Sequence, residues 1–188
     1  MALLKEIDER RSRKTFRDSG SDGKDSISAE QLQELIRAAQ RSPSCFNNQP
    51  GRFIVLAGEG CEMIHPALSR GNTWAKDAPA IIAIASHADL DCRITGRDYF
   101  MLGIGLQLEN LILQAVHRGL FAHPIAGFNE NIVKEALEIP DEYRVPVLVV
   151  IGHPNPDEEL ADKGRKPIGE VAFSNKWGIP LIDDSMEK

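Results

Sequence analysis

This 188-residue chain has few cysteines and no long apolar run. Its three cysteines, Cys45, Cys61 and Cys92, are an odd number without a CxxC spacing. We therefore expect reduced thiols in a cytoplasmic protein rather than a disulfide framework. A run of about 18 apolar residues is missing, which excludes a membrane-spanning helix. Residues 1–14 also lack the apolar core of a signal peptide, so we expect no membrane partner.

The motifs of several enzyme classes are missing as well. The five histidines show no metal-ligand spacing and there is no GxSxG elbow, so we expect no metal and identify no catalytic side chain. The sequence does not exclude a catalytic Ser-His-Asp set whose members are brought together by folding. Gly103 and Gly105 lack the third glycine of a dinucleotide-binding loop, and we expect them to admit a close backbone instead. The net charge of −6 argues against nucleic acid as a partner.

The length and the apolar content of 42% suit one domain spanning residues 1–188. Apolar periodicity and turn residues predict the elements of this domain. Helices are expected over residues 2–12, 28–42, 60–69, 99–119 and 129–137, and strands over 53–57, 80–86, 120–125 and 145–152. The spacing of the strands is irregular and no βαβ rhythm repeats. The pattern therefore predicts an α+β fold, with helices packed on a small mixed or antiparallel sheet.

The longest predicted helix organises the rest of the chain. Residues 99–106 contain no polar side chain, so we expect this part of the helix to be enclosed on every side. A polar stripe with helical period then begins at Gln107, and Gly119 is the expected stop. We expect this helix to fix the position of the Pro/Gly backbone segment 123–127 that follows it. The alternative is a core helix followed by an ordinary turn.

Basic residues are concentrated near the amino terminus of this acidic chain. No acidic residue lies within residues 10–17, which contain five cations. They predict an anion site to which Ser12 adds a hydroxyl donor, unless they only stabilise the end of the first helix. Lys163 and Arg165 are either solvated charges or a second arm of the same site.

The segment 42–53, SPSCFNNQPGRF, crowds hydroxyl and amide side chains between two prolines. Such side chains often serve only to complete a turn. They are also suited to hold a flat heterocycle that carries donors and acceptors on its edge. We interpret Cys45 as a small packing residue rather than a nucleophile.

Three separated motifs together resemble the nitroreductase family of flavin enzymes. They are RRSRKTF at 10–16, SPSCFNNQPGRF at 42–53 and HPIAGF at 123–128, and RKP at 165–167 fits the same order. The resemblance covers nearly the whole chain. It implies a three-layer α+β sandwich around a long central helix. It also implies a homodimer with FMN at the subunit interface, and a tail of about residues 154–188 that packs on the partner subunit.

The resemblance assigns cofactor-binding roles to individual positions. Positions in the first motif hold the FMN phosphate and ribityl chain, and Lys14 lies beside the pyrimidine edge of the flavin. The second motif comes from the other subunit, the backbone of the third faces flavin N5, and the basic pair in the tail closes on the phosphate. The implied residues are Arg10, Arg11, Ser12, Lys14, Pro43, Ser44, Cys45, Asn47, Gln49, Pro124, Ile125, Ala126, Gly127, Lys163 and Arg165.

The implied function is hydride transfer from NADH or NADPH to FMN, followed by reduction of a nitroaromatic, a quinone or a similar small acceptor in a ping-pong cycle. The flavin carries this chemistry, so no acid or base side chain is required. Two alternatives stay open: a flavin store or redox sensor with little turnover, and a specialised branch such as flavin fragmentation or reductive dehalogenation. Gly51 replaces a tryptophan of many relatives, which predicts looser packing, and Ala126 replaces a glutamate found in some.

Overall fold

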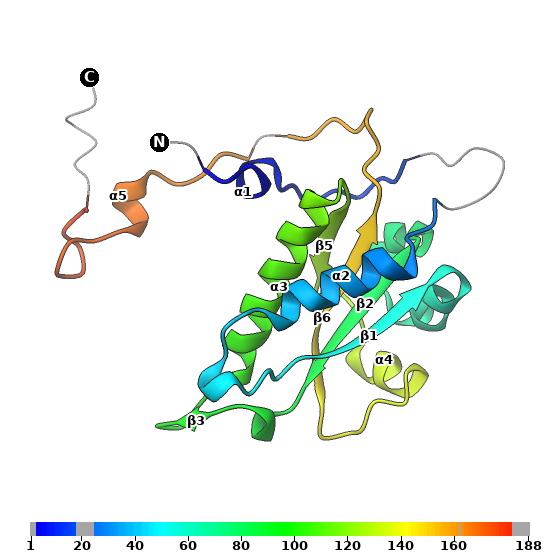
Figure 1. The fold of residues 1–188 in the computed structure, drawn as a ribbon, viewed down its shortest axis with the longest axis horizontal. Helices are drawn as coiled ribbons and strands as arrows, with labels where there is room; N and C mark the ends of the chain where they lie inside the picture. The colour runs from blue at the N-terminus through cyan, green and yellow to red at the C-terminus, as the bar shows by residue number, and fades with distance from the viewer. Residues whose placement is uncertain (1–2, 18–24, 162, 182–188) are drawn as a thin grey trace. The chain divides into compact units, whose positions relative to one another are not determined.

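The computed structural model describes residues 3–17, 25–161 and 163–181, and most of the polar segment 18–26 lies outside the described residues. The chain forms two compact units, Met1–Glu158 and Glu159–Lys188. The first contains a four-stranded antiparallel sheet in the order β1-β2-β6-β5 (Figure 1). Its strands are β1 Arg52–Ala57, β2 Ala80–Ser86, β5 Phe121–Ile125 and β6 Arg144–Gly152, and a separate hairpin joins β3 Arg93–Ile94 to β4 Arg97–Asp98.

Helices cover both faces of this sheet, which confirms the predicted α+β class. The α-helices of the first unit are α1 Lys5–Glu9, α2 Ala29–Gln40, α3 Phe100–His117 and α4 Glu130–Ala136. The 3-10 helices are η2 Cys45–Asn47, η3 Gly58–Ala67, η4 Arg70–Asp77 and η5 Ala88–Leu90. Within the part of the chain that the structure describes, no helix has both the length and the apolarity needed to cross a bilayer.

Two apolar cores lie on opposite faces of β2, because successive strand residues point to opposite sides. Ile82 and Ile84 belong to the core shared with α2 and α3, which cross one face of the sheet (Figure 1). Ile81 and Ala83 belong to the core shared with η3 and α4. The result is the three-layer arrangement that the sequence predicted. Strand β1 lies at the edge of the sheet, and its Val55 is 39% exposed.

Local signals located α2 correctly. The Ser28 hydroxyl accepts a hydrogen bond from the Gln31 amide, and the Gln31 side chain accepts one from the Ser28 amide. This capping box satisfies amides that the first turn leaves unpaired. Two other predictions were wrong in extent. Helix α1 is only five residues long, and the predicted helix at 60–69 is η3, after which η4 begins at Arg70 where a stop was expected.

Helix α3 ends as predicted, with Gly119 in the left-handed region at φ +70°. The expected enclosure of its first half was wrong. Met101, Leu102 and Leu106 are 50%, 58% and 38% exposed, and we call these three residues the α3 apolar face. The predicted polar stripe instead begins with a buried residue, since Gln107 is 1% exposed. An apolar sequence pattern does not distinguish a core from a surface that another chain covers.

Gln107 explains why a glycine stands at position 51. The Gln107 Oε1 atom accepts a hydrogen bond of 3.0 Å from the Gly51 amide. A Cβ atom at position 51 would lie 2.3 Å from this oxygen, far inside van der Waals contact. The looser packing expected at Gly51 was therefore wrong, because Gln107 occupies the space. Gly103 admits the Pro50 ring in the same region, whereas Gly105 faces open space.

We expect Gly51→Ala to lower the free energy of unfolding by about 1–3 kcal/mol, the usual cost of overpacking a buried site. Denaturant unfolding monitored by circular dichroism measures this loss. In a Gln107→Ala background the same substitution should cost much less, because the colliding oxygen is gone. Additive costs in the double variant would contradict this account, since residues in contact should couple.

Candidate functional site

The basic segment 10–17 runs beside strand β5. The Arg17 amide donates to the His153 carbonyl at 3.0 Å, and Phe16 bridges to Pro154. The His123 Nδ1 atom lies 2.7 Å from the Arg13 carbonyl oxygen. These contacts bring together two of the three motifs on which the resemblance rests, although more than 100 residues separate Arg13 from His123.

The cations of this segment have different surroundings. Arg13 lies 3.5 Å from Glu158, whose other carboxylate oxygen accepts the Lys14 amide at 3.0 Å. The Arg11 guanidinium folds back and donates to the carbonyls of Asp8 and Arg10 at the end of α1, at 2.6 and 2.9 Å. Arg11 therefore caps a helix end in this conformation instead of facing an anion. Lys14 is exposed, and its ammonium group pairs with no described residue, so it is available to a ligand.

The backbone after β5 is clamped by η4. The Gly127 carbonyl accepts hydrogen bonds from the Ser69 amide and the Asn72 side chain, both at 3.0 Å. A Cβ atom on Gly127 would lie 2.6 Å from the Ser69 hydroxyl and from Asn72 Nδ2, so only glycine fits without movement. Ala126 is exposed and presents little beyond its backbone. The sequence did not indicate a role for Ser69 and Asn72, because these residues lie at the end of the helix predicted over 60–69 and just beyond it.

His123 is half-buried beside the Trp74 ring, with ring centroids 4.9 Å apart. Burial lowers the pKa of His123 below its ordinary value of 6.5, although its bond to the Arg13 carbonyl works in the opposite direction. The imidazole is therefore neutral at pH 7 and can donate its Nδ1 proton to that carbonyl. Its structural task is to hold the basic segment against β5.

This neutral state makes a pH-dependent prediction. The folded protein binds fewer protons than the unfolded chain as the pH falls from 6.5 to the lowered pKa of His123. The contribution of His123 to stability is thus fully present above pH 6.5 and is lost as the pH falls below it. Wild type should lose more stability between pH 7 and pH 5 than His123→Gln, whose amide does not titrate. Denaturant unfolding at both pH values measures this difference, and parallel losses would contradict it.

The loop 43–49 forms a second group of candidate residues. Both of its ends are anchored by buried polar side chains, because the Ser42 hydroxyl donates to the Leu106 carbonyl at 2.9 Å and the Ser86 hydroxyl donates to the Pro50 carbonyl at 3.0 Å. Between these anchors Phe46, Asn47 and Gln49 adopt φ of 48°, 60° and 50°. This left-handed region costs a residue other than glycine about 1–2 kcal/mol. The loop is thus held in a strained conformation.

A disulfide bond connects this loop to the segment before the β3–β4 hairpin. Cys45 and Cys92 are bonded, with their Cα atoms 5.9 Å apart, while Cys61 is buried and takes no part in this bond. The prediction of three reduced thiols was wrong for this pair, and Cys45 is not a simple packing residue. Forty-seven positions separate the two cysteines in the sequence, so no short motif could reveal their pairing.

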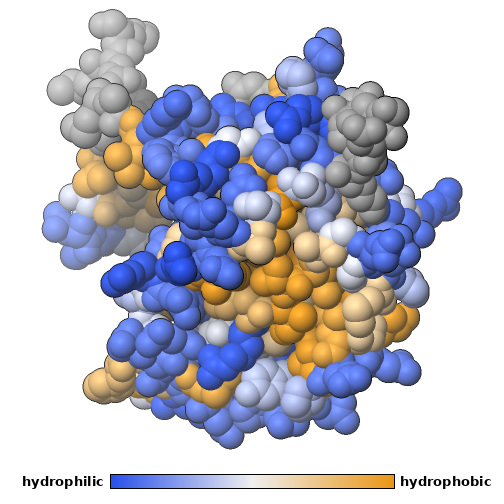
Figure 2. Space-filling model, turned by 45° about the vertical axis from the view of Figure 1, so that its right-hand side comes forward, coloured by the Kyte–Doolittle hydropathy of each residue, from blue (hydrophilic) through white to orange (hydrophobic). Residues whose placement is uncertain are grey.

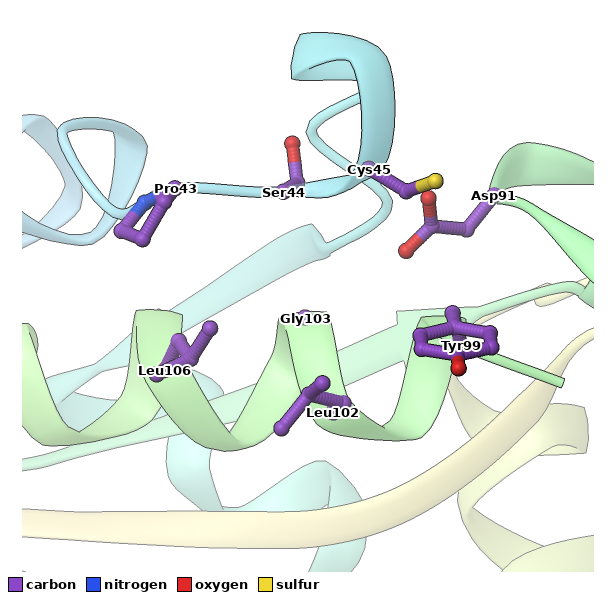
Figure 3. A pocket seen from close by; sticks show the side chains of 8 residues that line it. All are labelled: Pro43, Ser44, Cys45, Asp91, Tyr99, Leu102, Gly103 and Leu106. Atoms are coloured by element: carbon purple, nitrogen blue, oxygen red, sulfur yellow. The ribbon is translucent and has the colours of Figure 1, made fainter.

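A cavity of about 250 Å³ lies between this loop and α3. Figure 3 shows Pro43, Ser44 and Cys45 on one side and Tyr99, Gly103 and Leu106 on the other. Asp91 and Leu102 complete the lining. One oxygen of Asp91 accepts the Cys92 amide at 2.9 Å, whereas Oδ2 is buried without a hydrogen-bond partner among the described residues.

The two groups of candidate residues lie toward opposite ends of α3 (Figure 1). Glu6 of α1 contacts His117 at 2.9 Å near the last turn of the helix. Pro50, at the end of the loop, packs against Gly103 in the first turn. At 1.5 Å per residue these two positions of α3 are about 21 Å apart. A single chain therefore does not bring the loop 43–49 to the basic segment.

The second unit, Glu159–Lys188, contains one α-helix among its described residues, α5 Ile168–Val171. Lys163 and Arg165 are exposed, and the Arg165 guanidinium donates to the Gly164 carbonyl at 2.8 Å. Phe173 and Trp177 pack with ring centroids 4.8 Å apart, yet Trp177 is 90% exposed. Convergence of Lys163 and Arg165 with Arg10 on one phosphate stays a prediction.

Comparison with known proteins connects these features to a family. The family model described as "Nitroreductase family" matches residues 7–72 and 67–153. An uncharacterized 15.4 kDa protein of Mycolicibacterium smegmatis is 36% identical over 138 residues, and the match covers 69% of this chain and 86% of that protein. A protein of Thermus thermophilus named NADH dehydrogenase is 24% identical over 189 residues, covering 80% of this chain and 87% of that protein.

A solved structure shares the fold. A protein from Exiguobacterium sibiricum, crystallised in complex with FMN, superimposes with a TM-score of 0.79 at 20% sequence identity. The match covers 93% of this chain and 97% of that protein.

Proposed function

Because this chain belongs to the nitroreductase family, we propose that it is an FMN-dependent oxidoreductase that uses NADH or NADPH to reduce a nitroaromatic, a quinone or a similar small acceptor. The observation that carries this proposal is the contact between the basic segment and the segment 123–127, made by the Arg13 carbonyl and the His123 ring. The FMN complex of one structural neighbour and the name of the Thermus thermophilus relative support the cofactor and the donor.

The residues at this junction fit a flavin mononucleotide. A phosphate dianion needs cations and hydroxyl donors, and Arg10 and Ser12 supply them next to the exposed Lys14. A planar ring also needs a close backbone, which Gly127 provides because no side chain fits there. Bound FMN would supply the two-electron chemistry.

The protein's own residues would orient this cofactor and adjust its electronics. Lys14 would place a positive charge at the pyrimidine edge, where negative charge accumulates on reduction. Ser69 and Asn72 position the Gly127 carbonyl, and so fix the adjoining amides that would face flavin N5. With alanine at position 126 instead of glutamate, the backbone alone would make this contact. No side chain is assigned as a general acid or base.

We further propose a homodimer in which each subunit lends its loop 43–49 to the site of the other. The separation along α3 supports this arrangement, since the loop does not reach the basic segment of its own chain. The α3 apolar face lies beside that loop and is suited to pack against a second copy. On this interpretation, the cavity beneath the loop lies at the subunit interface.

Other apolar surface is available for the tail of a partner. A groove of about 470 Å³ lies beside the edge strand β1, lined by Ala29, Leu32, Gln33, Ile36, Arg37, Phe53 and Val55. Apolar side chains also gather on the face drawn in Figure 2, framed by hydrophilic ones. The second unit exposes apolar side chains of its own, at Ile168, Val171, Trp177, Ile179 and Leu181. We propose that this unit packs on the partner subunit and brings Lys163 and Arg165 to the phosphate.

An absorption spectrum and a turnover assay test the proposed function. Purified protein should bind one FMN per subunit with visible flavin absorption, and should then oxidise NADH or NADPH in the presence of a quinone. Protein that stays colourless after incubation with FMN would refute the proposal. Bound flavin without accelerated NADH or NADPH oxidation would instead indicate a flavin store or redox sensor.

A further inference from the structure

We propose that Cys45 and Cys92 form a reversible thiol–disulfide exchange site whose substrates are small dithiols, and that its oxidation state controls the loop 43–49. The disulfide fastens the loop when it is oxidised, and its reduction releases the loop. Neither part requires a bound cofactor. Only the expected effect on FMN binding rests on the function proposed above.

The position of the disulfide permits attack by a small thiol. Both cysteines are half-buried, in contrast to Cys61, which is fully buried. Cys45 lines the cavity of about 250 Å³ between the loop and α3, and its sulfur points toward Asp91 in Figure 3. Exchange requires a thiolate to approach a sulfur atom, so access is the first condition for a reducible bond. A disulfide that served only to stabilise the core would not need this exposure.

The disulfide is the main connection between the strained part of the loop and residues 91–92. The polar contacts across this junction are weak, because Asn48 Nδ2 lies 3.3 Å from Asp91 Oδ1 and 3.8 Å from Cys92 Sγ. The left-handed conformations of Phe46, Asn47 and Gln49 favour relaxation once the bond opens. The buried anchors at Ser42 and Gly51 stay intact, which confines the movement to the loop.

Asp91 gives the reduced form a compensating interaction. Its Oδ2 atom is buried and accepts no hydrogen bond from the residues that the structure describes. The sulfur atoms of Cys45 and Cys92 and one carboxylate oxygen of Asp91 all lie within 4.8 Å of one another. A disulfide has no proton to donate, whereas each thiol formed on reduction carries an S–H donor. Reduction can therefore satisfy an acceptor that oxidation leaves unpaired, which favours a bond that opens and closes.

The exchange is balanced in atoms and electrons. A thiolate of the dithiol attacks one cysteine sulfur, the Cys45–Cys92 bond breaks, and the other cysteine leaves as a thiolate and takes up a proton. The second thiol of the reductant then attacks the mixed disulfide and releases the first cysteine. Two electrons and two protons pass to the protein, and the dithiol becomes a cyclic disulfide.

A redox titration of the full chain tests the exchange site. Protein is equilibrated in defined ratios of reduced to oxidised dithiothreitol, alkylated without unfolding, and analysed by mass spectrometry. Cys45 and Cys92 should become labelled together as the ratio rises and should be protected again on reoxidation, while Cys61 stays unlabelled. The Cys61→Ser variant should behave as wild type. The proposal fails if the pair resists excess reduced dithiothreitol, or if it is labelled equally in fully oxidised buffer.

Amide hydrogen exchange tests control of the loop. The amides of Asn47, Asn48 and Gln49 are hydrogen-bonded within the loop in the oxidised state. Reduction should speed their exchange at least about tenfold, and Cys45→Ser with Cys92→Ser should exchange fast in either buffer. The amide of Gly51, outside the loop, is the internal control. Unchanged exchange on reduction would overturn control of the loop.

FMN titration of both redox forms separates this proposal from the proposed function. Reduced protein should bind FMN at least about tenfold more weakly than oxidised protein, because a mobile loop pays an ordering cost on binding. Redox-dependent exchange without FMN binding in either form would refute the proposed function and leave the exchange site standing. FMN binding that ignores the redox state, although the loop is released, would refute a role of the disulfide in the cofactor site.

Discussion

Replacing Arg10 and Arg165 together by alanine is expected to weaken FMN binding by a factor of about 100 to 10,000. Each residue is assigned to the FMN phosphate, and a hydrogen bond to a charged group contributes about 1.5–3 kcal/mol. Two such contacts amount to about 3–6 kcal/mol, and each 1.4 kcal/mol is a tenfold change in Kd. The fold should survive, since Arg10 is half-buried, Arg165 is exposed, and neither side chain forms an ion pair with a described residue.

Isothermal titration with FMN measures the affinity, and denaturant unfolding of the apoprotein checks the fold. Arg41→Ala is the matched control, because this exposed arginine follows α2 and is not assigned to the phosphate. Each single variant should show an intermediate loss. An unchanged Kd in the double variant would place the phosphate elsewhere. A loss confined to Arg10→Ala would show that the second unit does not reach the site.

Leu102→Asp is expected to dissociate the proposed homodimer and to abolish most FMN binding with it. Leu102 is 58% exposed in one chain and belongs to the α3 apolar face, beside the loop that is proposed to cross to the partner. An uncompensated charge buried in an interface costs about 3–5 kcal/mol, so the dimer should weaken by a factor of about 100 or more. Loss of the partner removes its loop from the flavin.

Sedimentation velocity over a range of concentrations measures the dimer, and FMN titration follows in the same samples. Met63→Asp is the matched control, since Met63 is exposed to a similar extent, 50%, but lies in η3, which packs against the other core. It should leave both the dimer and FMN binding unchanged. A Leu102→Asp protein that remains dimeric would show that another surface forms the interface.

Short-range signals accounted for much of the fold. Helix α2 is capped by Ser28 and Gln31, α3 ends at the predicted left-handed glycine, and β2 is a continuous apolar run. Each of these signals acts within a few residues. The family resemblance was likewise readable, because its three motifs are continuous stretches in a constant order. The local signals predicted the α+β class, and the motifs led to the expectation of a flavin site.

Contacts between distant segments could not be predicted from such short-range signals. Nothing near Cys45 in the sequence indicates a bond to Cys92, and nothing near Gly127 indicates its clamp by Ser69 and Asn72. The choice between Arg13 and Lys14 as the available cation depends on Glu158, which lies 144 positions after Lys14. Packing of the whole sheet decides which of these groups meet.

The sequence by itself determined the local elements, the fold class and the family, because helix caps, apolar periodicity and continuous motifs depend on neighbouring residues. Only the tertiary structure decided that the first half of α3 has an exposed apolar face, that a glutamine fills the space beside Gly51 and that a disulfide fastens the loop 43–49. The physical reason is that the surroundings of a side chain are set by segments far away in the sequence. An apolar residue looks the same in the sequence whether its own core or a second chain covers it.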